Sequence, residues 1–473
     1  MRYTLAHVGS MRRTLEKALY WFVIAGIFTT PLIPLVIVPS TYMPFDAAKG
    51  FAFRIIVELI TGAWLALAIV FDKYRPRRSS ILSAFAIFVL VMAIADAQGA
   101  NPYLSFWSNY KRMDGWITLI HVFMFIMVTS SMLTTEKIWS SLFQVSIIVS
   151  FFVDIVGFLQ LTGFPAVVDY RQSGLNARIG GTFGNPSTLA AYMLFHIFIV
   201  TYLWMKTSNG PHNKQPVLSI AYASVIVLDT IILFFTGTRG AILGLVVGGI
   251  ITLLIFAFVL GSHRAHWIAI GAIVGVVALA SNLALTDQTS FVRKIGFIDR
   301  LAAISLNDPS AKSHLSYIKM AWQGVKERPI FGWGQENYST VYSKYADSPI
   351  RNPDPWSDRV HNIIFDQLIA GGFMGLFGYL SIFATALWEL WRRNTFSSLE
   401  QTILSGLFAA YFFQNLFFFD STTSYIFLGM VLAYIVSRSY RDMQEHESTA
   451  RESLLLPFVI TVPAWIQRSD DKS

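Results

Sequence analysis

Residues 240–261 read GAILGLVVGGIITLLIFAFVLG, a run without a single charged side chain. As an α-helix, about 20 apolar residues cross roughly 30 Å of hydrocarbon, which is the thickness of a bilayer core. A helix that is apolar on every side has no face suited to water. The stretch therefore predicts a membrane span.

Runs of the same kind recur along the whole chain. They predict twelve spans, near residues 18–38, 51–71, 80–97, 114–133, 138–160, 186–205, 217–235, 240–261, 266–285, 360–391, 400–418 and 423–438. The expected fold class is an all-α polytopic membrane protein, with about 12 transmembrane helices and one long extracytoplasmic loop.

The overall composition supports this class. The 473 residues are 54% hydrophobic and only 14% charged, whereas an average soluble domain is roughly 25% charged. These values exclude a soluble enzyme. The net charge of +8 does not indicate nucleic-acid binding here, because Lys and Arg collect in the cytoplasmic loops of membrane proteins.

Lys and Arg are concentrated in the segments that share a side with the N-terminus, so both termini are expected in the cytoplasm. Arg12, Arg13 and Lys17 resemble the start of a signal peptide, but no small-residue cleavage site follows, and we expect a retained first helix. The predicted division is 1–285 for helices one to nine, 286–359 for an extracytoplasmic loop with short helices, 360–438 for helices ten to twelve, and 439–473 for a cytoplasmic tail. Within the tail, 454–466 is apolar but short and is expected to lie at the membrane interface.

The loop 286–359 breaks the pattern of short connections. It contains an amphipathic pattern near 311–327, followed by a turn-rich stretch with Pro329, Gly332 and Gly334. A long connection in a compact protein usually carries function. We therefore expect the functional site beside this loop.

Three polar residues are predicted at the outer membrane face, next to the loop. Arg178 precedes the sixth span, Arg239 lies in the short Thr236–Gly240 connection, and His361 lies at the outer end of the tenth span. Each has an ordinary explanation, because an interfacial arginine often extends to lipid headgroups and a single histidine near a helix end is usually structural. Their coincidence at one face favours function.

The chemistry that such a set supports is group transfer. Arginine presents a planar, permanently charged fork that matches phosphate oxygens, so two of them could neutralise a diphosphate leaving group. A neutral histidine could accept the proton of an attacking hydroxyl. The chain has no cysteine, and its outer loop has no closely spaced pair of acids for a divalent cation. We expect metal-independent transfer without a cofactor.

Polar groups inside the spans are expected to be structural. Arg54 and Glu58 are four residues apart and are predicted to pair with each other. Structural pairing is also the favoured interpretation for Asp154 and Asp229. For the remaining candidates, His121 and His196, we expect hydrogen bonds between helices.

At these residues the chain resembles the O-antigen ligase and polymerase superfamily of bacterial envelope glycosyltransferases. The resemblance rests on three features, namely the segment 177–186, the segment 237–240 and the long loop. In the loop an amphipathic helix leads into 328–338, and the loop closes with 361–362 and 371–376. It implies a large helical bundle whose outer loop packs over a cavity. It also implies an undecaprenyl-diphosphate-linked glycan as donor, a hydroxyl of a lipid-linked chain or of lipid A–core as acceptor, and membrane lipids as surroundings.

The resemblance also implies residue roles. Arg178 and Arg239 match the diphosphate-binding arginines, and His361 matches the proposed catalytic base of a direct, inverting transfer. Further supporting candidates are Asn185, Arg300, His314, Arg359, Asn362 and Asp366. One departure is visible, because many members carry an arginine just before the loop helix where this chain has Ser313 and His314. Arg300, further upstream, is a candidate substitute.

Several functions remain open at this point. The resemblance favours an O-antigen ligase in the bacterial inner membrane with its site facing the periplasm, and thus a role in lipopolysaccharide biosynthesis. A polysaccharide polymerase or a protein O-oligosaccharyltransferase of the same superfamily would share its fold and donor. A transporter or lipid flippase would carry its polar site near the bilayer midplane. A non-catalytic scaffold would tolerate replacement of both outer arginines.

Overall fold

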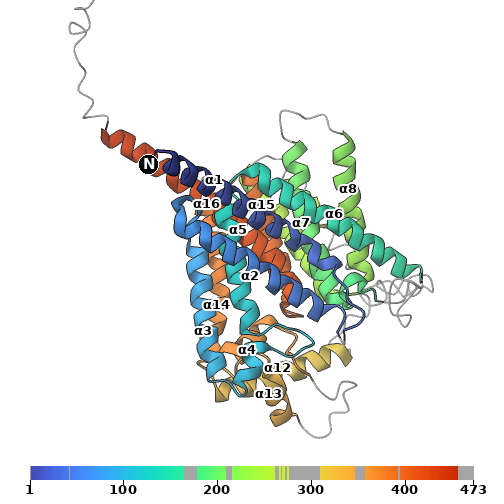
Figure 1. Ribbon diagram of the computed structural model, residues 1–473. Coiled ribbons are helices and arrows are strands. Elements are labelled where there is room, and N and C mark those ends of the chain that lie inside the picture. Colours follow the sequence, from blue (N-terminus) through green and yellow to red (C-terminus); the bar gives the residue numbers. More distant parts are fainter. Residues whose placement is uncertain are drawn as a thin grey trace, which may run out of the picture.

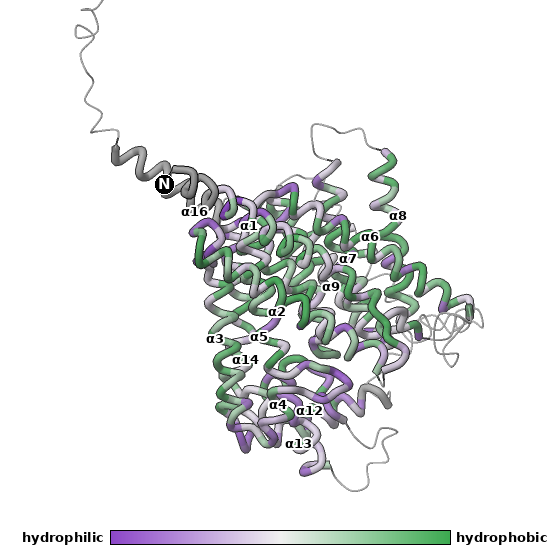
Figure 2. Tube along the Cα trace, viewed as in Figure 1, coloured by the Kyte–Doolittle hydropathy of each residue, from purple (hydrophilic) through white to green (hydrophobic). Residues whose placement is uncertain are grey.

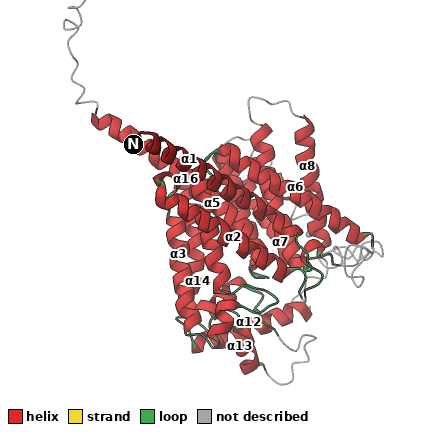
Figure 3. Cartoon of the chain, in the orientation of Figure 1, coloured by secondary structure: helices red, strands yellow, loops and turns green. Residues whose placement is uncertain are grey.

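The structure is a computed structural model that describes residues 2–41, 43–164, 178–208, 216–260, 309–346, 357–392 and 395–455, with short pieces between 266 and 275. Within these residues all regular secondary structure is helical (Figure 3). The α-helices are α1 (Arg2–Thr29), α2 (Asp46–Val70), α3 (Ser80–Ala97), α4 (Pro102–Trp107), α5 (Trp116–Met132), α6 (Glu136–Leu161), α7 (Pro186–Ser208), α8 (Pro216–Phe235), α9 (Arg239–Leu260), α12 (Pro309–Glu327), α13 (Tyr338–Tyr345), α14 (Ile363–Arg392), α15 (Ser398–Asn415) and α16 (Thr422–Leu455). Short 3-10 helices occupy η1 (Thr30–Leu35), η2 (Asp72–Tyr74) and η3 (Gly181–Phe183).

Eight helices in the described part of the chain are long and apolar enough to cross a membrane. They are Ser10–Leu35, α2, α3, α6, α7, α8, Arg239–Val259 and α14. α5 is a shorter apolar helix, and α15 and α16 begin close to the expected starts of the last two spans. Three expected features fall outside the described residues. Arg300 does so wholly, and the expected span 266–285 and the segment 454–466 do so for most of their length.

The long helices pack side by side and leave a polar layer at one end of the bundle. Figure 2 shows hydrophobic residues along the long helices and hydrophilic residues around α4, α12 and α13. This layer lies at the opposite end from the N-terminus (Figure 1). α12 occupies the position expected for the amphipathic helix at 311–327, and α13 is a further short helix within the loop 286–359, whereas α4 was not expected.

Small residues let α9 and α15 approach closely. A Cβ atom added to Gly244 would lie 2.7 Å from the carbonyl oxygen of Ala410, and one added to Gly248 would lie 2.6 Å from that of Gly406. Backbones that meet at this distance favour van der Waals packing, which drives helix association where lipid replaces water. The contact holds the start of α9, with Arg239, against the turn that follows α15.

The polar layer is anchored to α14 at a kink. Gly372 has φ +63° and interrupts the helix, and the turn after α12 docks against it. The backbone N–H of Trp333 donates to the Ile369 oxygen at 2.6 Å, and that of Phe373 donates to the Pro329 oxygen at 2.7 Å. The kink thus exposes backbone groups of α14 that the loop satisfies, and this contact brings the motifs at 328–338 and 371–376 together.

One expectation about the spans is wrong. Arg54 does not bond Glu58 but donates to the Met113 oxygen at 2.6 Å and to the hydroxyl of Thr118, while Glu58 lies 3.0 Å from the Nε2 atom of His121. The reason is tertiary, because α5 packs against α2 and offers closer partners to both side chains.

Candidate functional site

His361 lies in the loop that enters α14, and its backbone is strained. Its φ is +56°, a left-handed conformation that is uncommon for a residue with a side chain and is often retained at functional sites. Its imidazole is surrounded by rings, with centroid distances of 5.3 Å to Phe419, 5.7 Å to His314 and 6.2 Å to Tyr317. Burial, and secondarily the charge of His314, lower the pKa of His361 to about 4, so the ring is neutral near pH 7.

His314 comes from α12 and faces His361. Burial lowers its pKa, and a hydrogen bond to the backbone of His361 partly opposes this effect. The loop helix therefore contributes an imidazole at the position where the resemblance led us to expect an arginine. This contact couples the loop helix directly to the predicted base.

Arg359, two residues before His361, contacts side chains from three segments. Its guanidinium contacts Glu336 and lies 2.8 Å from Asp366 and 3.9 Å from Asp114. Burial alone would lower the Arg359 pKa, but the three carboxylates raise it above its usual value. Arg359 is 7% exposed, and its charge is committed to these carboxylates. Arg359 therefore has a structural role next to His361.

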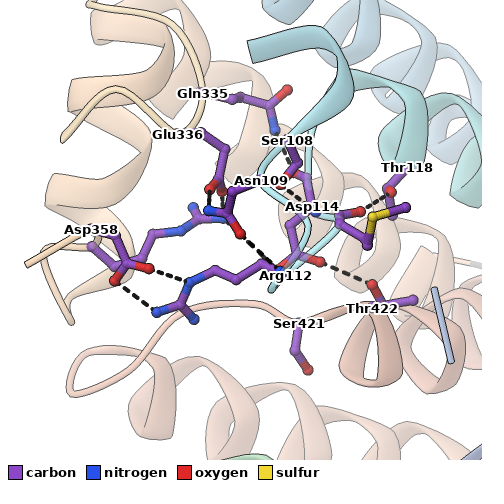
Figure 4. Close-up of polar contacts among 12 residues, drawn as sticks. Ser108, Asn109, Arg112, Asp114, Thr118, Gln335, Glu336, Asp358, Ser421 and Thr422 are labelled. Carbon is purple, nitrogen blue, oxygen red and sulfur yellow. Dashed lines mark hydrogen bonds and ion pairs between the residues drawn. The ribbon is translucent and has the colours of Figure 1, made fainter. Parts of the chain in front are cut away.

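A second ion pair joins Arg112 and Asp358, as Figure 4 shows. The Nε and NH2 atoms of Arg112 donate to the two carboxylate oxygens of Asp358, each at 2.8 Å. Burial raises the pKa of Asp358, but Arg112 more than reverses this and brings it to about 2. Asn109 donates to Glu336 at 2.6 Å and Thr422 donates to Asp114 at 2.9 Å. The loop before α5, the outer loop and the start of α16 are joined by these contacts.

The structure places Arg178 next to the turn that leads to Arg239. The Nε atom of Arg178 donates to the Thr236 oxygen at 3.0 Å, and NH2 donates to the Thr238 hydroxyl at 3.2 Å. Arg239 is the first residue of α9. The two predicted diphosphate-binding residues thus meet at one connection.

The glycine-rich segment after Arg178 is held by three helices. Gln160 accepts the backbone N–H groups of Gly180 at 3.1 Å and Gly181 at 2.9 Å. The amine of Lys49 donates to the Thr182 oxygen at 2.7 Å, and Asn185 accepts the N–H of Ser187 at 2.8 Å, so Asn185 caps α7. The motif is structural over most of its length and positions the arginine that precedes it.

The turn between α15 and α16 connects the arginine pair with His361. A Cβ atom added to Gly240 would lie 2.9 Å from Phe417, while Asn362 donates to the Leu416 oxygen at 2.9 Å. The next residues, Phe418 and Phe419, contact the His361 ring. His361 and Gly240, which follows Arg239, therefore contact the same turn, and Arg178 contacts the connection that leads to Arg239.

The sequence analysis did not single out Arg112, Asp114, Glu336 or Asp358 as site residues, although Glu336 lies within the motif at 328–338. The charged run at 358–359 beside His361 was the clearest available signal, but partners more than two hundred positions away cannot be inferred from it. Of the supporting candidates, Asn362 accepts the N–H of Phe365 at 3.1 Å and caps α14, and Asp366 holds Arg359. Among the described residues, no group of three or more His, Asp or Glu side chains is arranged to hold a metal ion.

Comparison with known proteins indicates the family to which part of this chain is similar. Residues 224–380 match the family described as O-Antigen ligase. The match includes Arg239, the loop helix α12 and His361, and it ends beyond the kink of α14. The chain is a multi-pass membrane protein whose residues 224–380 match the O-antigen ligase family, in agreement with the resemblance of its sequence motifs.

A curated relative is the teichuronic acid biosynthesis protein TuaE of Bacillus subtilis (strain 168). It is 25% identical over 285 residues, which span 56% of this chain and 53% of the relative. The chain thus matches about half the length of this relative.

Proposed function

We propose that this protein is a glycosyltransferase that moves a glycan from undecaprenyl diphosphate to a hydroxyl acceptor at the periplasmic face of the bacterial inner membrane. The observation that supports the proposal is that the 236–240 connection, which carries Arg239 and binds Arg178, and the strained His361 both contact the turn between α15 and α16. The proposed topology has twelve spans with both termini in the cytoplasm.

In the proposed reaction, the acceptor oxygen forms a bond to the anomeric carbon of the donor sugar. The bond from that carbon to the diphosphate oxygen breaks, and its electron pair leaves on the diphosphate. The hydroxyl proton moves to His361, which acts as general base. Arg178 and Arg239 neutralise the charge that develops on the leaving group. A single displacement of this kind inverts the anomeric centre and needs neither a metal nor a cofactor.

The acceptor separates the candidates within this reaction class. We favour lipid A–core, which would make the protein an O-antigen ligase. The name of the relative refers to teichuronic acid biosynthesis. It supports a polysaccharide polymerase as the alternative to the ligase. A protein O-oligosaccharyltransferase has the same donor and site.

A transporter or lipid flippase is a second candidate class, favoured by polar groups inside the spans. Ser150 donates to Asp229, and Ser146 bonds His196 at 2.7 Å. His196 is 0% exposed and also bonds the Tyr192 oxygen at 2.8 Å, so these groups fit the helix-to-helix hydrogen bonds expected of them. The residues of the candidate site lie at the polar end of the bundle instead, and this position supports the glycosyltransferase over the transporter.

The experiment is a transfer assay with purified protein. The protein is incubated with a lipid-linked glycan and, in separate reactions, with lipid A–core, a second lipid-linked glycan or an acceptor protein, without added metal. Formation of a linked product supports the proposal and identifies the acceptor. Replacement of Arg239 by Ala should weaken donor use, and Lys should restore it only in part because it cannot form a two-pronged contact with phosphate. Wild-type protein that forms no product with any acceptor would contradict the proposal.

A further inference from the structure

A polar cavity lies next to Phe419, whose ring contacts His361. Its lining residues are Asp46, Lys49, Arg112, Asp114, Asn185, Thr188, Phe419, Ser421, Thr422 and Thr423. They come from the first turns of α2, α7 and α16 and from the loop before α5. The first turn of a helix leaves backbone N–H groups without partners inside the helix, so donors as well as hydroxyls gather around this space.

The cavity wall holds two cations and two carboxyl groups, and both cations already have partners. The amine of Lys49 donates to the oxygens of Val36 at 2.9 Å and Thr182 at 2.7 Å, and Arg112 forms its paired contact with Asp358. Two carboxylates, Asp46 and Asp114, offset these two cations. A wall without excess positive charge does not favour a diphosphate. It suits an uncharged ligand that is rich in hydroxyl groups.

Two hydroxyls in the wall have no partner within the described residues. Thr188 is 5% exposed and Thr423 is 3% exposed, and neither side chain forms a hydrogen bond there although both line the cavity. By contrast, the neighbouring Thr422 donates to Asp114. Buried polar groups are almost always hydrogen-bonded in folded proteins, so these two hydroxyls are available to a ligand.

The position of the cavity identifies the part of the substrate that fits it. Asn185 belongs to the segment that follows Arg178, and Phe419 lies 5.3 Å from the His361 ring. The cavity is therefore bordered by the end of the segment that begins with Arg178 and by a ring that contacts the proposed base. In a direct displacement, the sugar that carries the reacting carbon lies between the leaving group and the base.

We propose that this cavity binds the donor sugar attached to the diphosphate, through hydrogen bonds from Thr188 and Thr423 to the sugar hydroxyls. The inference rests on the proposed transferase function and adds the substrate group that the cavity recognises. Thr188 and Thr423 are binding residues in this account and take no part in moving the proton.

The test uses Thr188→Val and Thr423→Val, which keep the side-chain shape and remove the hydroxyl. The donor is the lipid-linked glycan extracted from source cells that lack this protein and therefore accumulate it. Each variant should raise the KM for this donor about 3- to 10-fold, the effect of losing one neutral hydrogen bond, with little change in kcat. Thr201→Val is the matched control, because the Thr201 hydroxyl bonds Ile197 within α7, away from the cavity.

A second arm distinguishes a sugar site from a phosphate site. Undecaprenyl diphosphate without a sugar is used as a competitive inhibitor, and its inhibition constant should be the same for the variants and the wild type. An inhibition constant that rises as much as the KM would place the diphosphate in the cavity and overturn the inference. An unchanged KM in both variants would overturn it as well. Wild-type protein without transfer activity would instead remove the proposed function itself.

Discussion

At the scale of single residues, His361 is held in a strained conformation by its surroundings. The neighbouring Arg359 satisfies Glu336 and Asp366, and Glu336 itself has φ +64°. The guanidinium of Arg359 thus bonds Glu336, a residue with a left-handed backbone, and Arg359 lies two positions before another such residue, His361. Strain of this kind persists only where the surrounding contacts over-determine it, and here it directs the imidazole toward the turn at 416–421.

The pH dependence of transfer should report the environment of His361. Burial lowers its pKa from 6.5 to about 4, so the neutral, proton-accepting form persists as the pH falls below 6.5. The acidic limb of the profile of kcat/KM should therefore have its midpoint clearly below 6.5. A group with a depressed pKa also destabilises the folded state as the pH falls from 6.5 toward 4, so unfolding is measured in parallel. A midpoint at or above 6.5 would show that His361 is not the limiting base.

Replacement of Arg359 by Ala should strongly destabilise the protein. Glu336 and Asp366 are 5% and 6% exposed, and removing their shared partner leaves buried carboxylates unpaired, which typically costs about 3–5 kcal/mol. Thermal unfolding of detergent-solubilised protein measures the effect. The control is Lys344→Ala, which breaks an exposed pair with Glu327 and should change little. Equal melting temperatures for the two variants would mean that the Arg359 network does not stabilise the outer loop.

At the scale of elements, the kink in α14 and the turn after α12 form one unit. The N–H of Gly334 donates to the Ala370 oxygen at 3.0 Å, and the turn also reaches α3, where the N–H of Gln335 donates to Asp96 at 2.7 Å. The outer loop is thereby fixed to two spans. Its position, and with it that of His314, depends on a glycine conformation within a membrane helix.

Gly372→Ala should disrupt this unit. A Cβ atom at Gly372 would lie 2.3 Å from the Ile330 oxygen, and φ +63° adds strain whatever the space, so we expect a loss of at least about 1–3 kcal/mol in unfolding free energy. Gly62→Ala is the matched control, because a Cβ atom there meets nothing within 4 Å. Chemical unfolding in detergent compares the two variants. A Gly372 variant as stable as the Gly62 variant would contradict the role of the kink.

At the scale of the whole molecule, the sequence predicted the helices but not the contacts between residues that lie far apart in the chain. Hydrophobic runs such as 240–261 determine helices locally, because each backbone hydrogen bond closes within four residues. The amphipathic pattern near 311–327 is equally local. By contrast, the pairing of Arg112 with Asp358 joins positions 246 residues apart, and no periodicity encodes it. The mistaken Arg54–Glu58 pair has the same origin, since a neighbouring helix supplied better partners than the next turn.

The predicted orientation can be tested with single cysteines, because the chain has none of its own. Thr340→Cys, at an exposed position in α13, should react with a membrane-impermeant maleimide in intact cells whose outer barrier admits the reagent. Asp72→Cys, at an exposed position in η2, should react only after the inner membrane is opened. The opposite labelling pattern would place the outer loop, and the proposed site, in the cytoplasm.

The central claim is that His361 accepts a proton during glycan transfer, and the rate of the His361→Ala variant tests it most directly. Single-turnover transfer from the lipid-linked donor is measured for the variant and the wild type at equal donor occupancy. Loss of a general base typically lowers the rate by about 10²- to 10⁴-fold, so the account predicts a decrease in this range with donor binding retained. A variant that transfers glycan at the wild-type rate would contradict it.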